Sequence, residues 1–166
     1  MQYTGTVHAV PGKTGAKCRG AARIPQMRPT TDANLALVRR TYELWNIGGA
    51  EPLVEQIWPP DVVFYETPEM PDTGVYRGVD AVAGRMRDLI EAAGHFQITV
   101  CSLECSGEYV LATCVMSARG AISGLRLTKG IFHVLRCRGG RVREFRAHFD
   151  ARQARREYQR LCKAAV

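Results

Sequence analysis

The chain has 166 residues, of which 46% are hydrophobic and 23% are charged, as in an ordinary soluble globular protein. This length is sufficient for one domain with a sizeable core. No apolar run is long enough to span a membrane, and no apolar segment typical of a secretion signal follows the first residue, so we expect a cytoplasmic protein without a membrane partner.

The net charge of +7 is located at the two ends of the chain. Residues 32–135 carry eight basic and thirteen acidic side chains, whereas residues 136–166 carry ten basic and three acidic ones. A nucleic-acid-binding surface would need the two basic ends to share one face. A solvated tail and a solvated last helix explain the same pattern, so nucleic acid is not the expected partner.

The cysteine pattern does not indicate a metal site. The six cysteines form no Cys-x-x-Cys pair, and no histidine stands at zinc-ligand spacing from Cys101 and Cys105. Cys114 and Cys137 lie in apolar, strand-like runs, which is typical of reduced, buried thiols. Since the sequence also contains no phosphate loop and no nucleotide fingerprint, we predict neither a metal nor a cofactor.

Helices are predicted in the first part of the chain. Residues 1–30 contain several glycines and prolines and no apolar periodicity, so we expect a flexible basic tail that is dispensable for stability, followed by one domain at residues 31–163. The first helix follows N-cap candidates at residues 30–32. Its apolar face repeats at Leu35, Val38, Tyr42 and Trp45. The second and third helices are predicted at residues 51–57 and 79–93.

Strands dominate the second part of the chain. A short strand at residues 62–66 precedes a loop with two prolines at residues 67–78. Four strands and a basic helix follow the third helix, at residues 96–103, 109–118, 125–137, 142–149 and 151–162. Helices followed by antiparallel hairpins predict an α+β fold. Three N-terminal helices would pack in the concave face of a curved, mostly antiparallel sheet, and a short C-terminal helix would close the chain.

Such a fold would leave a conical pocket between the helices and the sheet. Alternation along the last strand places Phe145, Ala147 and Phe149 on one face, which we expect to face the pocket. Arg146, His148 and Asp150 would then face outward. In the preceding strand the pocket-facing residues are predicted to be Thr128, Gly130, Phe132 and Val134. The predicted ligand-binding residues are Trp45, Phe64, Met116, Phe132, Phe145 and Phe149. They suit a flat, hydrophobic ligand; the alternative is that they form a plain core.

Glu66 is the candidate carboxylate for proton transfer. Alternation along residues 62–66 places it on one face with Val62 and Phe64, at the mouth of the pocket. Burial there would raise the pKa of its carboxyl group toward neutrality, where proton transfer is most effective at physiological pH. The alternative is a structural carboxylate that is solvated or paired with Arg77.

Several local features within residues 32–160 resemble the SnoaL-like branch of the nuclear transport factor 2 superfamily. They are the Pro68-x-x-Pro71-x-x-Gly74-x-Tyr76-x-Gly78 loop, the Gly78-Val-Asp80-Ala-Val82 helix start, Phe132-His133-Val134, Gly140-Arg-Val142 and Phe145-x-Ala-x-Phe149-Asp150. The resemblance implies the conical α+β fold. It does not define one reaction, because this fold carries isomerases, cyclases, epoxide hydrolases, dehydratases and non-catalytic modules.

The ketosteroid isomerases of this superfamily imply one set of catalytic residues. Their base corresponds to Glu66, and their oxyanion-binding tyrosine corresponds to Thr41 or Tyr42. Their second oxyanion-stabilising acid corresponds to Phe132, so half of that machinery is absent. We therefore predict Glu66 as general acid/base and Tyr42 as a hydrogen-bond donor to a substrate oxygen.

The SnoaL-type cyclases imply a second set. They use an acid at the end of the last strand and a polar residue on a neighbouring strand, for which Asp150 and His133 are the nearest counterparts. Both lie on the face predicted to be outside the pocket, and a β-bulge would reverse this placement. The acid–arginine triad of limonene-type epoxide hydrolases is absent, since the matching positions read Cys114-Val-Met116 and Ala147.

The predicted function is therefore binding of a small hydrophobic molecule, with a cofactor-independent isomerisation, cyclisation or dehydration that uses a pocket carboxylate. The alternative is a non-catalytic ligand-binding, dimerisation or interaction module. A homodimer is expected, because the outer sheet face of such a cone is broad. That face would combine Arg146 and His148 with the apolar side chains of Ile131 and Leu135.

Overall fold

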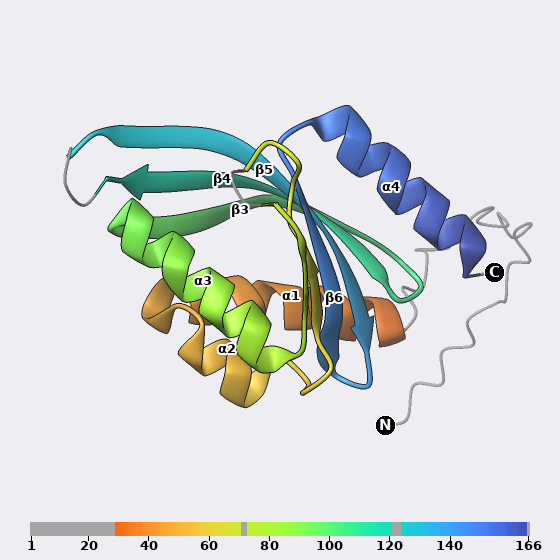
Figure 1. The fold of residues 1–166 in the computed structure, drawn as a ribbon. Coiled ribbons are helices and arrows are strands. Elements are labelled where there is room, and N and C mark those ends of the chain that lie inside the picture. Colours follow the sequence, from red (N-terminus) through yellow and green to blue (C-terminus); the bar gives the residue numbers. More distant parts are fainter. Residues whose placement is uncertain (1–28, 71–72, 121–123, 166) are drawn as a thin grey trace, which may run out of the picture.

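The computed structural model describes residues 29–70, 73–120 and 124–165 (Figure 1). Nearly all of the predicted tail, residues 1–28, lies outside the described residues. The elements are α1 (Pro29–Gly48), α2 (Glu51–Gln56), β1 (Val63–Tyr65), β2 (Val75–Arg77), α3 (Val79–Ala93), β3 (His95–Ser106), β4 (Tyr109–Arg119), β5 (Arg126–Arg138), β6 (Arg141–His148) and α4 (Ala151–Ala164).

The strands form one curved, mixed sheet in the order β2-β1-β6-β5-β4-β3. The strands β3 to β6 are joined as antiparallel neighbours, whereas β1 pairs parallel with β6. In Figure 1, α1, α2 and α3 lie on one side of the sheet and α4 lies on the other. The predicted α+β class, with three N-terminal helices in the concave face, is confirmed.

Glycines with a positive φ lie at the ends of α1 and α3, two helices on the concave side of the sheet. Gly49 has a φ of 67°, and its N–H bonds to the carbonyl of Trp45 at 2.8 Å, which ends α1. Gly78 (φ 87°) precedes α3 and Gly94 (φ 69°) follows it. Because residues with a Cβ avoid this backbone region, both ends of α3 agree with the predicted range 79–93.

The loop expected at residues 67–78 contains a strand, β2, so this part of the prediction is wrong. In this strand Tyr76 lies opposite Phe64 of β1, and the two rings stack. Three residues are too few to show a strand period in the sequence. The strand forms because the edge of β1 accepts its backbone hydrogen bonds, which is a tertiary effect.

A β-bulge in the β5–β6 hairpin reverses the faces that we predicted for β5. Cys137 lies opposite Val142, but the next pair is Arg136 with Glu144, so Arg143 is an extra residue in β6. A shift of one residue exchanges the two faces of the paired strand. Before Cys137, each residue of β5 therefore pairs with a residue of β6 one position later than in a hairpin without a bulge. The opposite set of β5 side chains then shares a face with Phe145 and Ala147.

Beyond the bulge, His133 lies opposite Ala147, and both face the concave side of the sheet. Ile131 and Leu135 also face this side, so placing them on the outer face was wrong. Phe132 points to the outer face and packs beside α4, which corrects its prediction as a pocket residue. The same correction applies to Val134, which is buried under α4.

The helix α4 covers part of the outer face of the sheet. Its residues Ala154, Tyr158 and Leu161 pack against Leu111 and Val134. This contact explains why β5 is apolar on both faces and why its alternation did not identify the inward side. The homodimer that we expected on this outer face stays a prediction.

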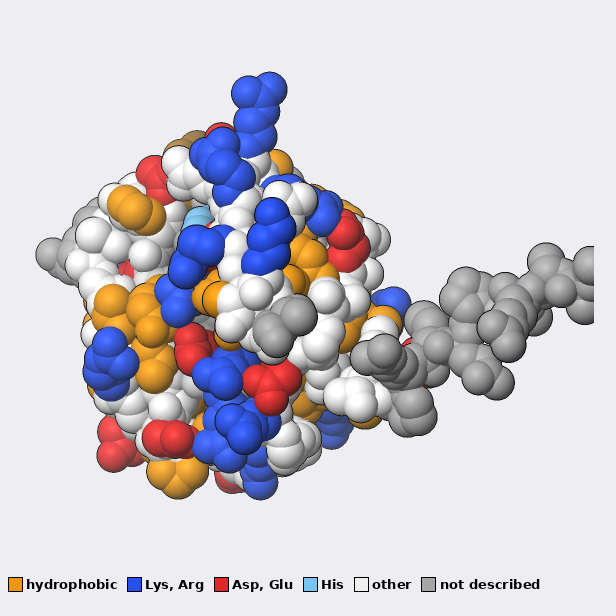
Figure 2. Space-filling view, turned by 90° about the vertical axis from the view of Figure 1, so that its right-hand side faces the viewer, with side chains coloured by type: hydrophobic (Ala, Val, Ile, Leu, Met, Phe, Trp, Pro, Cys, Tyr) orange, Lys and Arg blue, Asp and Glu red, His pale blue; other side chains and the backbone are white. Residues whose placement is uncertain are grey.

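The exposed side of α4 is basic, as predicted for a solvated last helix. Figure 2 shows a band of Lys and Arg side chains on this side of the molecule, interrupted by acidic ones. Arg155 pairs with Glu104, and Arg160 pairs with Glu157. These pairs offset part of the positive charge. None of the described helices has both the length and the apolar character that a membrane span requires.

Candidate functional site

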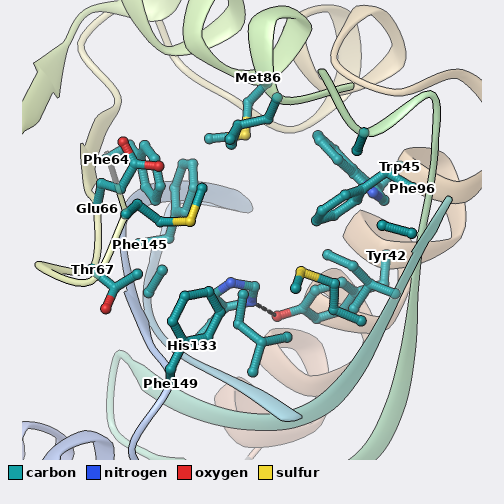
Figure 3. A pocket seen from close by; sticks show the side chains of 18 of the residues that line it. Tyr42, Trp45, Phe64, Glu66, Thr67, Met86, Phe96, His133, Phe145 and Phe149 are labelled. Atoms are coloured by element: carbon teal, nitrogen blue, oxygen red, sulfur yellow. Dashed lines mark hydrogen bonds between the residues drawn. The ribbon is translucent and has the colours of Figure 1, made fainter. Parts of the chain in front are cut away.

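A cavity of about 490 Å³ lies between the concave face of the sheet and the helices α1 and α3 (Figure 3). Its wall is mostly apolar. The predicted ligand-binding residues that line it are Trp45, Phe64, Met116, Phe145 and Phe149, with Tyr42 and Ala147 beside them. Phe64 and Phe145 stack with their ring centroids 4.5 Å apart, which gives the cavity one flat aromatic wall.

The two ends of the cavity differ in exposure. Leu127, which is 50% exposed, lines the outer end together with the exposed side chains of Glu69 and Lys129. Tyr42 and His133 line the buried part of the cavity and are 5% and 9% exposed, and Leu135, two residues farther along β5, is 3% exposed. A ligand would therefore enter between the loop after β1 and the start of β5 and would meet Tyr42 and His133 inside.

Tyr42 and His133 form the buried polar pair of this site. The hydroxyl oxygen of Tyr42 lies 2.8 Å from Nδ1 of His133, and the two rings are nearly parallel. Figure 3 shows this hydrogen bond at one end of the cavity, with the other edge of the imidazole ring facing the open space. The remaining ring nitrogen, Nε2, is therefore the one that can meet a ligand.

Burial keeps both members of this pair uncharged. Desolvation, with a smaller contribution from the charge of His148, lowers the pKa of His133 to about 4. Desolvation also raises the pKa of Tyr42 well above its usual value near 10. At neutral pH the site therefore presents a neutral phenol and a neutral imidazole, a form that can accept a proton.

Strand alternation predicted His133 outside the pocket, and this prediction is wrong. The cause is the β-bulge at Arg143, since a bulge in the hairpin reverses the expected faces. The other second-choice residue, Asp150, lies at the N-cap of α4. Its carboxylate accepts a hydrogen bond from the backbone N–H of Gln153 at 2.7 Å, and it is not among the cavity-lining residues.

Glu66 lines the cavity, as predicted, but its carboxylate is already engaged. Arg85 of α3 donates two hydrogen bonds to it, from Nε at 2.8 Å and from Nη2 at 2.9 Å. The side chains of Glu66 and Arg85 are 2% and 14% exposed, and the hydrogen bonds to Glu66 raise the pKa of Arg85. The ion-pair alternative named Arg77, whereas the partner in the structure is Arg85.

The arginine contact changes what Glu66 can do chemically. A bidentate guanidinium stabilises the ionised carboxylate and occupies both of its oxygens. The backbone N–H of Glu66 is also engaged, because it donates a hydrogen bond to the carbonyl of Gly74 at 3.0 Å. This geometry joins the end of β1, the following loop and α3 around the cavity.

We expect His133 to make the stability of the fold depend on pH. In the unfolded chain its pKa is near 6.5, whereas in the fold it is about 4. Between these values the unfolded chain binds the extra proton, so the stability is complete above pH 6.5 and is lost as the pH falls toward 4. The loss from pH 7 to pH 5 is about 2 kcal/mol for this group.

Urea unfolding of the wild type and of His133→Gln at these two pH values measures this effect. Because glutamine does not titrate, the variant should lose about 2 kcal/mol less than the wild type on acidification. His148→Gln is the matched comparison and should remove less of the pH dependence, because His148 is only half-buried. An equal loss in wild type and His133→Gln would show that His133 is not held neutral by the fold.

Solved structures of other proteins share this fold. A protein described as a SnoaL-like polyketide cyclase from Jannaschia sp. CCS1 is 15% identical, with a TM-score of 0.66 and coverage of 80% of this chain and 95% of that one. Bal32a, from a soil-derived mobile gene cassette, is 23% identical, with a TM-score of 0.65 and coverage of 78% and 98%. TerC, co-crystallised with polyporic acid, is 17% identical, with a TM-score of 0.62 and coverage of 76% and 97%. At these identities the likeness shows the fold alone.

The family assignment comes from the sequence. A search of curated proteins found no match. The sequence model of the SnoaL-like polyketide cyclase family matches residues 35–158, which include most of α1, the whole sheet and the first part of α4. The chain therefore belongs to the family of SnoaL-like polyketide cyclases.

Proposed function

We propose that this protein binds a flat, apolar molecule and moves a proton on it in a cofactor-independent isomerisation, cyclisation or dehydration. The observation that carries the proposal is the hydrogen bond between Tyr42 and His133, which is buried in a mostly apolar cavity. The imidazole nitrogen that is directed at the open space can exchange a proton with a bound ligand.

His133 is the proposed general acid/base, and Tyr42 is the residue that positions it. When Nδ1–H donates to the oxygen of Tyr42, the lone pair of Nε2 faces the ligand and can remove a proton from a carbon beside a carbonyl group. The resulting imidazolium can return the proton to another atom of the same molecule. When the hydroxyl of Tyr42 donates to Nδ1 instead, Nε2–H donates a hydrogen bond to a ligand oxygen.

The apolar wall contributes to the same chemistry. Trp58 stacks on Phe145 with a centroid distance of 5.7 Å, and Phe145 stacks on Phe64. A planar ring system that packs against this aromatic wall would displace water and hold its reacting carbon near Nε2 of His133. In the absence of water, the charge that develops on the ligand interacts more strongly with the imidazolium.

Membership of the SnoaL-like polyketide cyclases supports proton chemistry without a cofactor, and TerC shows that a protein of this fold was crystallised with an organic acid. Glu66 is the second candidate base, because it lines the same cavity. The two hydrogen bonds from Arg85 argue for a structural role of Glu66, since they engage both oxygens of its carboxylate and hold it in place.

Native mass spectrometry tests whether the cavity holds a ligand. We expect the purified protein to carry an apolar small molecule as a non-covalent adduct. Ala118→Trp, which adds an indole at the half-buried outer wall, should abolish the adduct because the side chain would obstruct the cavity. Ala36→Trp, on the exposed side of α1, is the matched control and should keep it. Equal retention by both variants would place the ligand elsewhere and contradict the proposal.

A further inference from the structure

The inward-facing row of β5 contains a lysine where an apolar residue would be expected. Among the described residues this row lines the cavity with Leu127, Lys129, Ile131, His133 and Leu135. Lys129 is also the only Lys or Arg among the described residues of the cavity wall. Residues that break a local pattern without an evident structural gain are typical of functional positions.

The ammonium group of Lys129 is held at the outer end of the cavity. Its Nζ lies 3.6 Å from the centroid of the Phe149 ring, which is itself part of the cavity wall. A cation over an aromatic face is attracted by the ring and remains able to bind an anion on its other side. Lys129 is exposed, so a ligand that enters the cavity passes this group.

Glu69 is the acidic residue at the same end of the cavity. Its carboxylate accepts a hydrogen bond from the hydroxyl of Thr67. This hydrogen bond, a backbone hydrogen bond and the charge of Lys129 lower the pKa of Glu69, so it is ionised at neutral pH. The hydroxyl of Thr67 therefore already donates a hydrogen bond to the Glu69 carboxylate. The negative charge of Glu69 would repel an anionic ligand that binds to Lys129.

Lys129 and His133 lie four residues apart on one face of β5. At a rise of roughly 3.3 Å per residue their Cα atoms are about 13 Å apart, a length that suits an elongated planar molecule. Its inner end would meet His133 and its outer end would meet Lys129. A ligand with an oxygen-bearing ring at one end and an anionic substituent at the other would fit both groups.

We infer that Lys129 selects ligands with a carboxylate at the outer end, so that the substrate of this protein is an elongated, polycyclic or otherwise planar organic acid. The inference rests on the proposed function, because it assumes that the cavity binds a flat apolar molecule. Beyond the proposed function, this inference specifies that the ligand is an anion and that its carboxylate lies at the outer end of the cavity.

Fluorescence titration with anthracene-2-carboxylate and its uncharged analogue anthracene-2-carboxamide tests the inference. The wild type should bind the acid roughly three- to fivefold more tightly than the amide, as for a partly exposed charge pair. Lys129→Met should remove this preference without changing the affinity for the amide. Glu69→Gln should increase the preference, because it removes the opposing charge. Arg126→Met, on the opposite face of β5, is the matched control and should behave like the wild type.

The two proposals fail in different ways. If Lys129→Met retains the preference for the acid, the role of Lys129 is wrong, while binding of both probes leaves the proposed function intact. If neither probe binds to the wild type, or if Ala118→Trp binds both as tightly as the wild type, the cavity is not the binding site. That result would overturn the proposed function and this inference together.

Discussion

Replacing His133 with glutamine is expected to lower kcat by about 10²- to 10⁴-fold, which is the contribution of a positioned acid/base group. Glutamine has a similar shape and can accept the hydrogen bond of the Tyr42 hydroxyl, so the cavity should stay intact. Its amide cannot take up a proton, so only the chemical step should be affected. The substrate for this assay is the molecule identified by native mass spectrometry, and product formation is followed under single-turnover conditions.

The pH profile provides a second measurement of the same residue. Because burial lowers the pKa of His133 to about 4, the acid limb of kcat/KM should fall near pH 4 rather than near 6.5. Above this pH the imidazole is neutral and competent as a base. An acid limb close to pH 6.5 would mean that the catalytic group is a solvated histidine or another residue.

Glu66→Gln is the comparison that separates the two candidate bases. We expect this variant to keep kcat within a few-fold of the wild type when it is assayed well below its melting temperature, because the amide still fills the same place beside Arg85. The opposite outcome, with wild-type turnover in His133→Gln and a large loss in Glu66→Gln, would return the role of general base to Glu66.

Replacing Arg85 with methionine is expected to lower the free energy of unfolding by about 3 kcal/mol. Methionine fills much of the space of the arginine stem but leaves the carboxylate of Glu66, which is 2% exposed, without its partner. A buried charge that loses its counterion carries the full cost of desolvation. Urea denaturation at pH 7 measures the change.

Two further variants show whether the cost comes from the buried charge. Arg87→Met, two residues along α3, removes an ion pair to Glu51 whose side chains are more than half exposed, and should cost less than about 1 kcal/mol. The double variant Glu66→Gln/Arg85→Met should be more stable than Arg85→Met alone, because no charge remains buried. Equal decreases in the free energy of unfolding for Arg85→Met and Arg87→Met would show that the buried Glu66–Arg85 pair stabilises the fold no more than an exposed ion pair.

Local patterns in the sequence determined the elements that surround the cavity. The apolar face of α1 predicted that Tyr42 and Trp45 point inward, and both line the cavity. Gly78 and Gly94 flank α3 at its predicted bounds, and their left-handed backbone favours glycine. Alternation along β6 placed Phe145 on the cavity face, because one face of this strand is more polar and its period is visible.

The proposed catalytic site depends on features that no local pattern contains. His133 faces the cavity because Arg143 forms a bulge, and β5 itself gives no hint of its inward side since α4 buries the other face. Glu66 meets Arg85 rather than Arg77 because α3 packs beside the end of β1, which brings together residues nineteen positions apart. The sequence by itself therefore determined the fold and the part of the apolar wall that α1 and β6 supply, where burial follows the helix or strand period. Only the tertiary structure decided which polar groups meet inside it, because strand register and helix packing depend on contacts between distant segments.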